Sequence, residues 1–260
     1  MTTISAENQT VALLTSAGPL PNIVANDLTK LGGRLVVLRE DGPPRGKMMK
    51  NRARRLGWPT AVGQTMSHHL FKIVGKASQR RINLIETEYA LNSKKQPEIE
   101  TILIKSVNSD HCRDELRKLD PAVVAVYATQ IIGKETLNCV PAPFINFHGG
   151  INPQYRGQCP TYWALVEGDA DHAGFTIHLV DEGVDTGDIL YQSKADFRHS
   201  DNIATYQHRV TAQAMPYFRQ AIDDALNNHL SPMSVSLPSK LWFPPTLWAY
   251  LWNGITRGVW

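Results

Sequence analysis

The segment Pro121-Ala-Val-Val-Ala-Val-Tyr127 restricts the possible folds of this chain more than any other feature of the sequence. An apolar, β-branched run without polar alternation is typical of a strand that is buried on both faces, as in a parallel sheet covered by helices. The beginning of the chain agrees, because an apolar strand (10–15), a turn, a helix (22–31) and a second strand (34–38) follow one another. We therefore predict an α/β, Rossmann-like fold with a mostly parallel twisted sheet flanked by helices.

Four further segments have the composition or alternation of strands: 101–105, 144–147, 173–180 and 189–192. The last two are predicted to pair as a hairpin. The helical spacing over 201–226 predicts a helix that is broken or kinked near Pro216. We expect one Rossmann-like domain over 1–200, followed by a C-terminal helix and a short aromatic-rich extension over 201–260.

Length and composition restrict the class of protein further. The 260 residues are 42% hydrophobic, which is typical of a soluble globular chain with a sizeable core. No apolar run approaches the ~20 residues of a membrane-spanning helix, and residues 1–18 lack the basic and apolar regions of a signal peptide. The spacings of the three cysteines indicate neither a disulfide framework nor a zinc site, so we expect a cytoplasmic protein.

The charge of the chain is unevenly distributed. Between Gly42 and Ile85 there are ten Lys and Arg residues and no Asp or Glu, and a basic helix is predicted over 46–56. Such a segment is either a solvated helix face or a patch for phosphate groups, which a nucleotide, a nucleic acid or an anionic membrane would supply. The charge alone does not distinguish these partners.

Two polar side chains lie at the end of the strand over 144–147. Asn146 and His148 are two residues apart, so on an extended segment they point to the same side. An imidazole can exchange a proton near neutral pH, and an amide can donate to a developing oxyanion, which together suit acyl transfer. An Asn-x-His pair is also common as a purely structural element, so the pair alone does not define a site.

A second polar feature is the loop over 181–188, which carries four carboxylates among two glycines. It is either a solvated turn or the source of a carboxylate that orients and charges His148. The loop lacks the ligand spacing and the terminal Glu of a calcium-binding EF-hand, and we expect no metal.

These segments together resemble the folate-dependent formyltransferase family. Its members carry an Asn-x-His at a strand end, a Tyr/Trp-Arg-Gly shortly after it and a downstream acidic loop; here these are Asn146-Phe147-His148, Tyr155-Arg156-Gly157 and the loop that ends at Asp188. The resemblance implies a catalytic triad of Asn146, His148 and Asp185. It further implies that N10-formyltetrahydrofolate is the co-substrate, in a pocket lined by Gln130, Ile131, Ile132, Asp181 and Val184.

Departures from the family pattern bear on the acceptor. The His-Pro-Ser that is common in the family is His148-Gly149-Gly150 here. The glycine-rich phosphate loop of the purine-pathway member is replaced by the segment 15–19. A chain of 260 residues is also expected to be too short for the C-terminal barrel of the methionyl-tRNA enzyme. The resemblance is therefore to nucleotide-sugar N-formyltransferases, most of all those that act on GDP-perosamine in O-antigen and lipopolysaccharide biosynthesis.

A nucleotide-linked amino sugar, GDP-linked above all, is the partner that this resemblance implies, and the basic segment would clamp its diphosphate. The residues assigned to this acceptor are Lys47, Arg52, Tyr155 and Arg156. Two alternatives remain: the acceptor is glycinamide ribonucleotide or methionyl-tRNA, or the chain is a non-catalytic binding protein of the same fold that holds nucleic acid or an anionic membrane. Our main expectation includes no nucleic-acid partner.

The last 24 residues hold four of the six tryptophans. Leu247, Trp248, Leu251 and Trp252 fall at helical spacing and form one apolar stripe that is suited to packing against another surface. That surface is the chain's own core, a second subunit of a homodimer, or a membrane. Packing on the core is the arrangement we expect.

Overall fold

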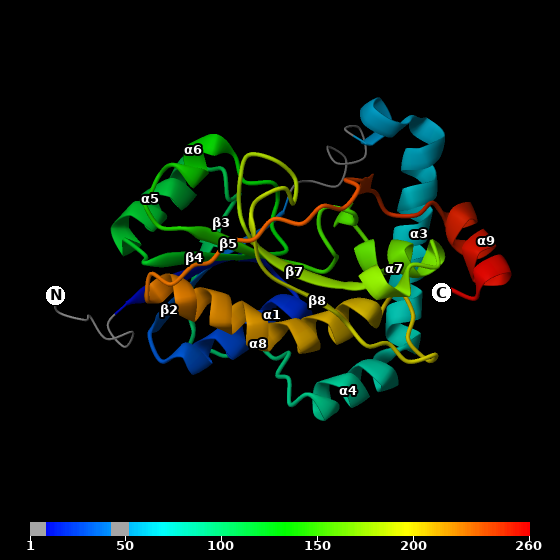
Figure 1. Cartoon of the computed structure of the whole chain (residues 1–260), viewed down its shortest axis with the longest axis horizontal. Helices are drawn as coiled ribbons and strands as arrows, with labels where there is room; N and C mark the ends of the chain where they lie inside the picture. Colours follow the sequence, from blue (N-terminus) through cyan, green and yellow to red (C-terminus); the bar gives the residue numbers. More distant parts are fainter. Residues whose placement is uncertain (1–8, 43–51) are drawn as a thin grey trace.

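The computed structural model describes residues 9–42 and 52–260. These residues form a seven-stranded sheet with the order β3-β2-β1-β4-β5-β7-β8 (Figure 1). Neighbouring strands from β3 to β5 are parallel, and β7 and β8 continue the sheet in antiparallel pairing. The strands are β1 Thr10–Ser16, β2 Arg34–Glu40, β3 Glu100–Ile104, β4 Val123–Tyr127, β5 Phe144–His148, β7 Gly174–Leu179 and β8 Ile189–Lys194. The predicted α/β, mostly parallel fold is thus confirmed.

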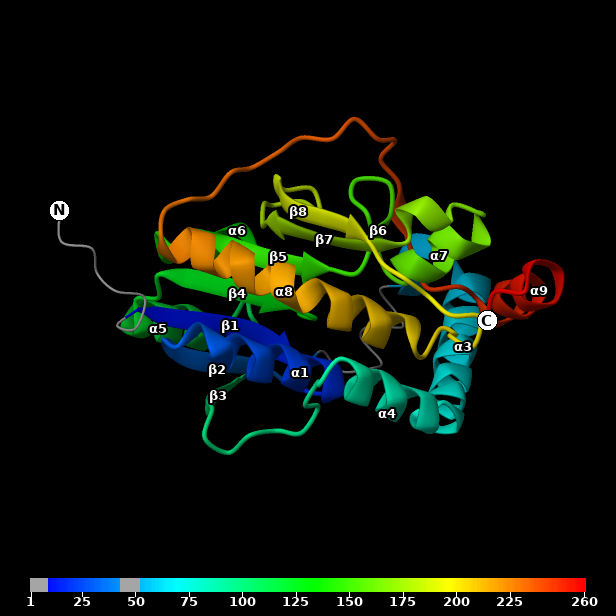
Figure 2. The same cartoon turned by 60° about the horizontal axis from the view of Figure 1, so that its bottom comes forward.

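Helices cover both faces of this sheet. Figures 1 and 2 show α1 (Pro19–Leu28) and α8 (Tyr206–Leu226) on one face and α5 (Asp110–Leu119) with α6 (Lys134–Leu137) on the other. The 3-10 turn η2 (Thr29–Leu31) continues α1 and leads into β2. The sheet therefore has two apolar cores, one under each layer of helices.

The residues of β4 divide between these two cores. Val123 and Ala125 pack in the core with α1 and α8, whereas Val124 and Val126 pack in the core with α5. This alternation follows from the period of two along a strand, and it explains why β4 has no polar position. The predicted central strand, buried on both faces, is confirmed.

The chain after β5 also agrees with most of the predicted elements. Residues 173–180 and 189–192 form the antiparallel pair β7–β8. The helix predicted over 201–226 forms as α8, which continues through Pro216 without a break, with Met215 and Phe218 held in the core on either side of it. The other predicted outcome, a kink at Pro216, stays a prediction. The division of the chain after residue 200 stays a prediction; α8 contributes side chains to the same core as the sheet.

The remaining elements gather at one end of the sheet (Figures 1 and 2). They are α3 Trp58–Ala77, α4 Gln79–Glu88, β6 Arg156–Gly157, α7 Pro160–Val166, η3 Ala170–His172, β9 Leu241–Trp242 and α9 Leu247–Arg257. The C-terminal segment joins them through β9, which pairs in parallel with β6. Of the predicted basic helix over 46–56, residues 46–51 lie outside the described part of the chain and residues 52–56 are helical.

The aromatic helix α9 packs on the rest of the protein with other residues than those of the predicted apolar stripe. Its buried residues are Tyr250, Asn253 and Gly254, whereas Trp248, Leu251 and Trp252 are exposed. The Tyr250 ring meets the Phe71 ring of α3 edge to face, with 5.0 Å between the ring centroids. The expected packing of the aromatic C-terminal segment on the chain's own core is thus confirmed for Trp242 and Tyr250, whereas it is wrong for Trp248, Leu251 and Trp252. None of the described helices, α9 included, is long and apolar enough to cross a membrane.

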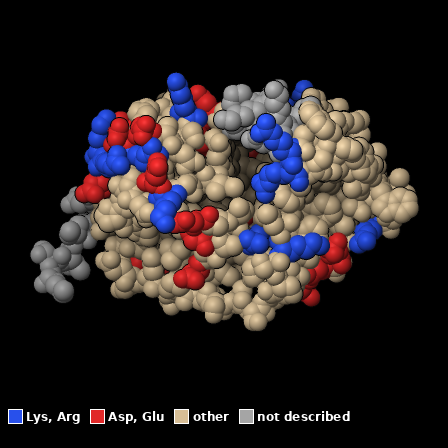
Figure 3. All heavy atoms as spheres, turned by 90° about the horizontal axis from the view of Figure 1, so that it is seen from above, with Lys and Arg blue, Asp and Glu red and all other residues tan. Residues whose placement is uncertain are grey.

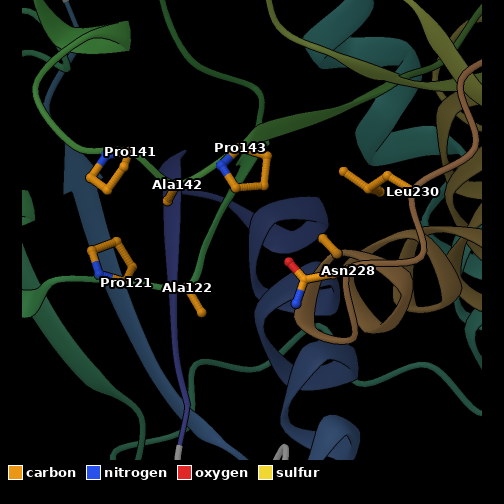
Figure 4. A pocket seen from close by; sticks show the side chains of 8 residues that line it. Pro121, Ala122, Pro141, Ala142, Pro143, Asn228 and Leu230 are labelled. Atoms are coloured by element: carbon orange, nitrogen blue, oxygen red, sulfur yellow. The ribbon is translucent and has the colours of Figure 1, made fainter. Parts of the chain in front are cut away.

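A hollow of about 490 Å³ lies at the edge of the sheet where β4 and β5 begin (Figure 4). Pro121 and Ala122 precede β4, Pro143 precedes β5, and Asn228 and Leu230 follow α8. The eight described residues that line it include no charged side chain. Ligands of open α/β sheets bind at the opposite edge, where the parallel strands end, so the functional site is expected at that edge.

Candidate active site

Asn146, His148 and Asp185 come together at the carboxyl end of β5. The Asp185 Oδ1 atom lies 3.5 Å from the Asn146 Nδ2 atom and 3.5 Å from the His148 Nδ1 atom. Asn146 and His148 lie on the same side of β5, as the period of a strand requires, and Asp185 reaches them from the loop between β7 and β8. The structure thus brings the three predicted catalytic residues into one cluster, and their catalytic roles stay a prediction.

The imidazole of His148 is oriented by a backbone carbonyl. Its Nε2 atom lies 2.8 Å from the Tyr155 carbonyl oxygen, which can only accept, so Nε2 carries a hydrogen and donates it. The Nδ1 atom then faces Asp185. Because His148 is only 7% exposed, this arrangement fixes both ring nitrogens in a buried position.

Asp185 is held as a carboxylate. Burial alone would raise its pKa, but the neighbouring His148, the His178 ring and the backbone N–H of Gly157 together hold the pKa of Asp185 below its usual range. The Gly157 N–H donates to Asp185 Oδ2 over 2.9 Å. Asp185 also has a left-handed backbone with φ 52°, which costs energy for a residue other than glycine and is typical of functional loops.

The Tyr155-Arg156-Gly157 segment supports this cluster through each of its three residues. The Tyr155 carbonyl accepts from His148, the Arg156 Nη1 atom donates to the Val184 carbonyl over 2.9 Å, and the Gly157 N–H donates to Asp185. Gly157 has φ +92°, and a Cβ atom there would lie 2.4 Å from the Trp242 carbonyl oxygen of β9. The motif therefore requires glycine at this position for both conformation and space.

The glycines after His148 also follow from close contacts. A Cβ atom on Gly150 would lie 2.4 Å from the Pro160 Cβ atom, 2.6 Å from the Tyr155 carbonyl oxygen and 2.9 Å from the His148 Nε2 atom. A Cβ atom on Gly149 would meet only the end of the Gln207 side chain within 3.1 Å. Gly150 thus allows the close approach that orients the imidazole.

Two further residues belong to the site, and the sequence did not single them out. His178 of β7 is paired with Asn146 of β5, and its Nε2 atom lies 3.0 Å from the Asn146 Nδ2 atom. Its Nδ1 atom lies 2.7 Å from the Leu179 carbonyl oxygen, so Nδ1 carries the hydrogen and Nε2 accepts from the amide of Asn146. His178 therefore fixes the orientation of the Asn146 amide.

The second is Glu40, which ends β2 and is 3% exposed. Its carboxylate accepts from the Gln130 backbone N–H over 2.6 Å and from the Gln130 side-chain amide over 3.0 Å. A buried carboxylate with these partners shapes the segment that follows β4. The only signal in the sequence is a glutamate at the end of an apolar strand.

The residues predicted to line the folate pocket lie on two segments that meet. Ile131 is exposed, Ile132 is buried in the core under α5, against which Val180 also packs, and Lys134 forms an ion pair of 2.9 Å with Glu182. Asp181 accepts from the Gly183 N–H and from the Thr186 hydroxyl, so it stabilises its own loop. Val184 contributes its carbonyl to Arg156. Contact of these residues with folate stays a prediction.

The residues predicted to bind the acceptor are placed less uniformly. Lys47 lies outside the described residues. The Arg52 guanidinium is close enough to Cys159 to oppose the effect of burial, which raises the pKa of that thiol to about 12. Tyr155 is buried, and its hydroxyl donates to Asp169 over 2.9 Å, so its contact with the cluster is made by the backbone. Figure 3 shows a hollow on the upper side of the molecule as drawn in Figure 1, with Lys and Arg side chains along one side of it.

The cluster has no arrangement typical of a metal centre. Within 9–42 and 52–260, no group of three or more His, Cys, Asp or Glu side chains could hold a metal ion. A buried imidazole, a carboxylate held in its charged form and an oriented amide are the groups of a proton-transfer and oxyanion site. These groups suit the catalysis of group transfer, which is the class of protein that the predicted roles of Asn146, His148 and Asp185 imply on this α/β fold.

Comparison with protein families places the chain within that class. The sequence model of the formyl transferase family matches residues 59–222, which include Asn146, His148 and Asp185. This is more than half of the chain. The protein belongs to the formyl transferase family.

Curated relatives match over a shorter region. The methionyl-tRNA formyltransferase of Anaeromyxobacter dehalogenans (strain 2CP-C) is 43% identical over 93 residues, which cover 36% of this chain and 29% of that enzyme. The methionyl-tRNA formyltransferase of Syntrophus aciditrophicus (strain SB) is 32% identical over 133 residues, or 51% of this chain and 42% of that enzyme. The matched part of this chain spans less than half the length of these relatives.

Solved structures match over most of the chain at low identity. A sugar N-formyltransferase from Shewanella sp FDAARGOS_354 is 16% identical with a TM-score of 0.56, covering 90% of this chain and 76% of that one. Glycinamide ribonucleotide transformylase 1 from Symbiobacterium toebii is 18% identical with a TM-score of 0.56, covering 85% and 89%. An N-formyltransferase from Helicobacter canadensis, in complex with folinic acid and dTDP-3-aminofucose, is 12% identical with a TM-score of 0.55, covering 90% and 70%. At these identities the likeness concerns the fold.

Proposed function

We propose that this chain transfers a formyl group from N10-formyltetrahydrofolate to the amine of an amino-sugar nucleotide. The observation that carries this proposal is the convergence of Asn146, His148 and Asp185 at the carboxyl end of β5, in a chain of the formyl transferase family. The formyl donor supplies an electrophilic carbon bonded to the leaving nitrogen of the folate. The protein has to deprotonate an amine and stabilise the oxygen of the reacting carbonyl.

Each group of the cluster then has one task. The Nε2–H of His148 is held by the Tyr155 carbonyl, so Nδ1 is the atom that accepts a proton from the attacking amine. Asp185 stabilises the imidazolium that forms, and the imidazolium then gives its proton to the departing nitrogen of the folate. The amide of Asn146 donates to the oxygen on which negative charge develops, an effect worth about 3 kcal/mol for a single donor.

The segments at the folate side fit an apolar ring system with polar edges. Ile131 presents an exposed apolar side chain, the Glu40–Gln130 contact fixes the chain beside it, and the Lys134–Glu182 pair joins this segment to the 181–188 loop. We propose that Gln130, Ile131, Ile132, Asp181 and Val184 form the folate pocket. Arg52 and Lys47 then serve the diphosphate of the acceptor, together with Arg156, because guanidinium groups suit phosphate oxygens.

The finer proposal is that the acceptor is GDP-perosamine, which assigns the protein to O-antigen and lipopolysaccharide biosynthesis in the cytoplasm. It rests on the resemblance of the aromatic C-terminal segment and on the basic segment 42–85. The three cysteines are free, which agrees with a reducing compartment.

The second candidate acceptor is methionyl-tRNA. The partial matches to methionyl-tRNA formyltransferases, at up to 43% identity over 93 residues, favour it, and the basic segment suits RNA as well as a diphosphate.

A panel of acceptors tests these proposals. The purified protein is mixed with N10-formyltetrahydrofolate and, separately, with GDP-, dTDP- and UDP-linked amino sugars, glycinamide ribonucleotide and methionyl-tRNA, and the formylated product is identified by mass spectrometry. We expect a formylated GDP-linked sugar. Formylation of methionyl-tRNA alone would show that methionyl-tRNA, and not an amino-sugar nucleotide, is the acceptor. A protein that binds folate but formylates no acceptor would contradict both proposed functions.

A further inference from the structure

A carboxylate outside the catalytic cluster gathers three hydrogen-bonding partners. Asp169 lies between α7 and η3, and its Oδ2 atom accepts from the Tyr155 hydroxyl over 2.9 Å and from the Gln154 side-chain amide over 2.8 Å. Its Oδ1 atom lies 2.7 Å from the Nδ1 atom of His172. Burial alone would raise the pKa of Asp169, but the hydrogen bonds from His172 and Tyr155 hold this pKa below its usual range. The proposed reaction gives Asp169 no task.

Tyr155 joins this carboxylate to the catalytic cluster. The residue is 2% exposed, its ring stacks on the Trp242 ring with 5.7 Å between the centroids, and its hydroxyl ends at Asp169. Burial and the bond to Asp169 raise the pKa of the Tyr155 hydroxyl, so the hydroxyl keeps its hydrogen and donates it. The carbonyl oxygen of the same residue lies 2.8 Å from the His148 Nε2 atom. Tyr155 thus connects Asp169 to the catalytic imidazole.

The segment that joins His148 to Tyr155 is held differently at its two ends. At its beginning, the carbonyls of the two glycines accept from threonine hydroxyls. At its end, Tyr155 donates its N–H to a carbonyl of the segment itself, a bond that closes a turn but does not attach the turn to the rest of the protein. The tyrosine side chain supplies such an attachment, through its ring to Trp242 and through its hydroxyl to Asp169. The direction of the Tyr155 carbonyl is therefore set in part by the hydroxyl.

The direction of this carbonyl decides which nitrogen of His148 carries the hydrogen. The ring is flanked by two acceptors, the Tyr155 carbonyl 2.8 Å from Nε2 and the Asp185 carboxylate 3.5 Å from Nδ1. A neutral imidazole has one hydrogen, so it donates to one of them only. The shorter contact favours the hydrogen on Nε2, which leaves Nδ1 able to accept a proton. If the carbonyl moves away, the hydrogen shifts to Nδ1, where the carboxylate accepts it, and Nδ1 no longer acts as a base.

We propose that Asp169 is a positioning residue for formyl transfer, which holds the Tyr155 carbonyl in place so that the neutral His148 ring keeps its hydrogen on Nε2. The role of Nδ1 as the base rests on the proposed function, whereas the choice of tautomer follows from the contacts of the ring. Gln154 and His172 act on the carboxylate and keep it directed at the Tyr155 hydroxyl.

Nitrogen NMR of the histidine side chains tests the tautomer without an activity assay. The full chain is labelled with the magnetic nitrogen isotope in histidine, and the signals of His148 are identified by their loss in His148→Asn. At a pH at which these signals show a neutral ring, we expect the hydrogen on Nε2 in the wild type. Tyr155→Phe removes the hydroxyl and retains the carbonyl. It should raise the fraction with the hydrogen on Nδ1 by about 5-fold, as expected when one hydrogen bond is weakened.

Steady-state kinetics of formyl transfer measure the consequence. Tyr155→Phe and Asp169→Ala should each lower kcat by about 10-fold and leave the KM of both substrates unchanged, because a small displacement of the proton acceptor slows the chemical step. The double variant should also lose about 10-fold rather than about 100-fold, because both substitutions break the same hydrogen bond. Asp169→Asn should retain most of the turnover, because its amide oxygen still accepts from the hydroxyl.

Tyr191→Phe is the matched control. Tyr191 on β8 also donates its hydroxyl to a carboxylate, that of Asp224 on α8, over 2.6 Å, but β8 is the edge strand of the sheet and this pair joins it to α8. The variant should keep the tautomer and the kcat of the wild type. Thermal melting checks that every variant folds, and Tyr155→Phe with Asp169→Asn decides the question if Asp169→Ala fails to fold.

Three results would overturn the proposal. The first is a wild-type His148 with its hydrogen on Nδ1, or a Tyr155→Phe variant with an unchanged tautomer. The second is a shifted tautomer with an unchanged kcat. The third is a Tyr155→Phe variant in which only the KM of the acceptor rises, since the hydroxyl would then bind the acceptor. A wild type that formylates no acceptor would contradict the proposed function instead, and the tautomers of the wild type and of Tyr155→Phe would still decide whether Asp169 orients the ring.

Discussion

Replacement of Gly150 by alanine tests whether the orientation of His148 depends on the close approach of the chain at this point. The new Cβ atom would lie within 3.0 Å of three atoms: the Pro160 Cβ, the Tyr155 carbonyl oxygen and the His148 Nε2. Two of these belong to backbone or to a proline ring, so they cannot move away without shifting β6 or α7. The imidazole is the one of the three contacts that can rotate, and rotation breaks its 2.8 Å hydrogen bond to Tyr155.

The expected magnitudes follow from this geometry. Overpacking by one methyl group costs about 2 kcal/mol of the free energy of unfolding when the surroundings cannot relax. A displacement of the proton acceptor by about 1 Å lowers turnover by about 10²-fold. We expect the KM for the formyl donor to change little, because the folate segments lie elsewhere.

Steady-state kinetics of formyl transfer and urea unfolding measure these two quantities. The matched control is Gly75→Ala in α3, where the new Cβ atom would lie 4.0 Å from the Ala204 Cβ atom. Alanine inside a helix is favoured over glycine, so the control should be stabilised by up to about 1 kcal/mol and retain full turnover. A Gly150→Ala variant with wild-type turnover would show that the Tyr155 carbonyl does not position the imidazole.

Four other predictions concern the site and its surroundings. Each single substitution in the cluster should lower kcat by about 10²-fold or more: Asn146→Ala, His148→Asn and Asp185→Asn. Circular dichroism should show a retained fold for all three. Full activity of His148→Asn would contradict the proposed catalytic triad. The pKa of Asp185 is held below its usual range in the folded protein, so the ionised carboxylate contributes to the free energy of unfolding. This contribution is complete above about pH 4 and is lost as the pH falls further. Below about pH 4 the urea midpoint of Asp185→Asn should therefore depend less steeply on pH than the midpoint of the wild type. Arg52→Ala and Lys47→Ala should raise the KM for the sugar nucleotide and leave that for folate unchanged; equal KM values would move the diphosphate site elsewhere. Truncation before Pro238 should yield an aggregating protein with low activity, measured by light scattering and turnover, because it removes β9 from β6 and bares α3; a soluble truncated chain of unchanged stability would contradict this.

The fold was predictable because its central strand is buried on both faces. Only a sheet covered by helices on both sides accommodates an uninterrupted apolar run such as β4, and the alternation of Val123 and Val124 between two cores is the result. The helix α8 was harder to predict, since a proline inside a helix weakens it locally. Packing of Met215 and Phe218 in the core outweighs that effect.

The candidate site was predictable where the residues are close in sequence. Asn146 and His148 share a side of β5 because of the period of two, which needs no knowledge of the fold. His178 could not be found in this way, because its contact with Asn146 depends on the register of β5 against β7, and register is set by tertiary packing. The contact of Glu40 could not be predicted from the sequence for a similar reason, since its partner Gln130 lies 90 residues further along the chain.

The aromatic C-terminal segment shows why composition alone does not decide burial. Trp242 is stacked between Tyr155 and Trp163, because the pairing of β9 with β6 sets it there. Eight to twelve residues later, the helix α9 buries Tyr250 and Gly254 and exposes Trp252. Its inner side must accommodate α3 and the Trp260 ring, which lies where a Cβ atom on Gly254 would be. An apolar stripe with helical spacing predicts an amphipathic helix equally well whether that stripe faces inward or outward. The inward side is chosen by the partner that fits it, and here the Trp260 ring against Gly254 and the hydrogen bond from Asn253 to the Tyr162 hydroxyl favour the side that carries Tyr250, Asn253 and Gly254.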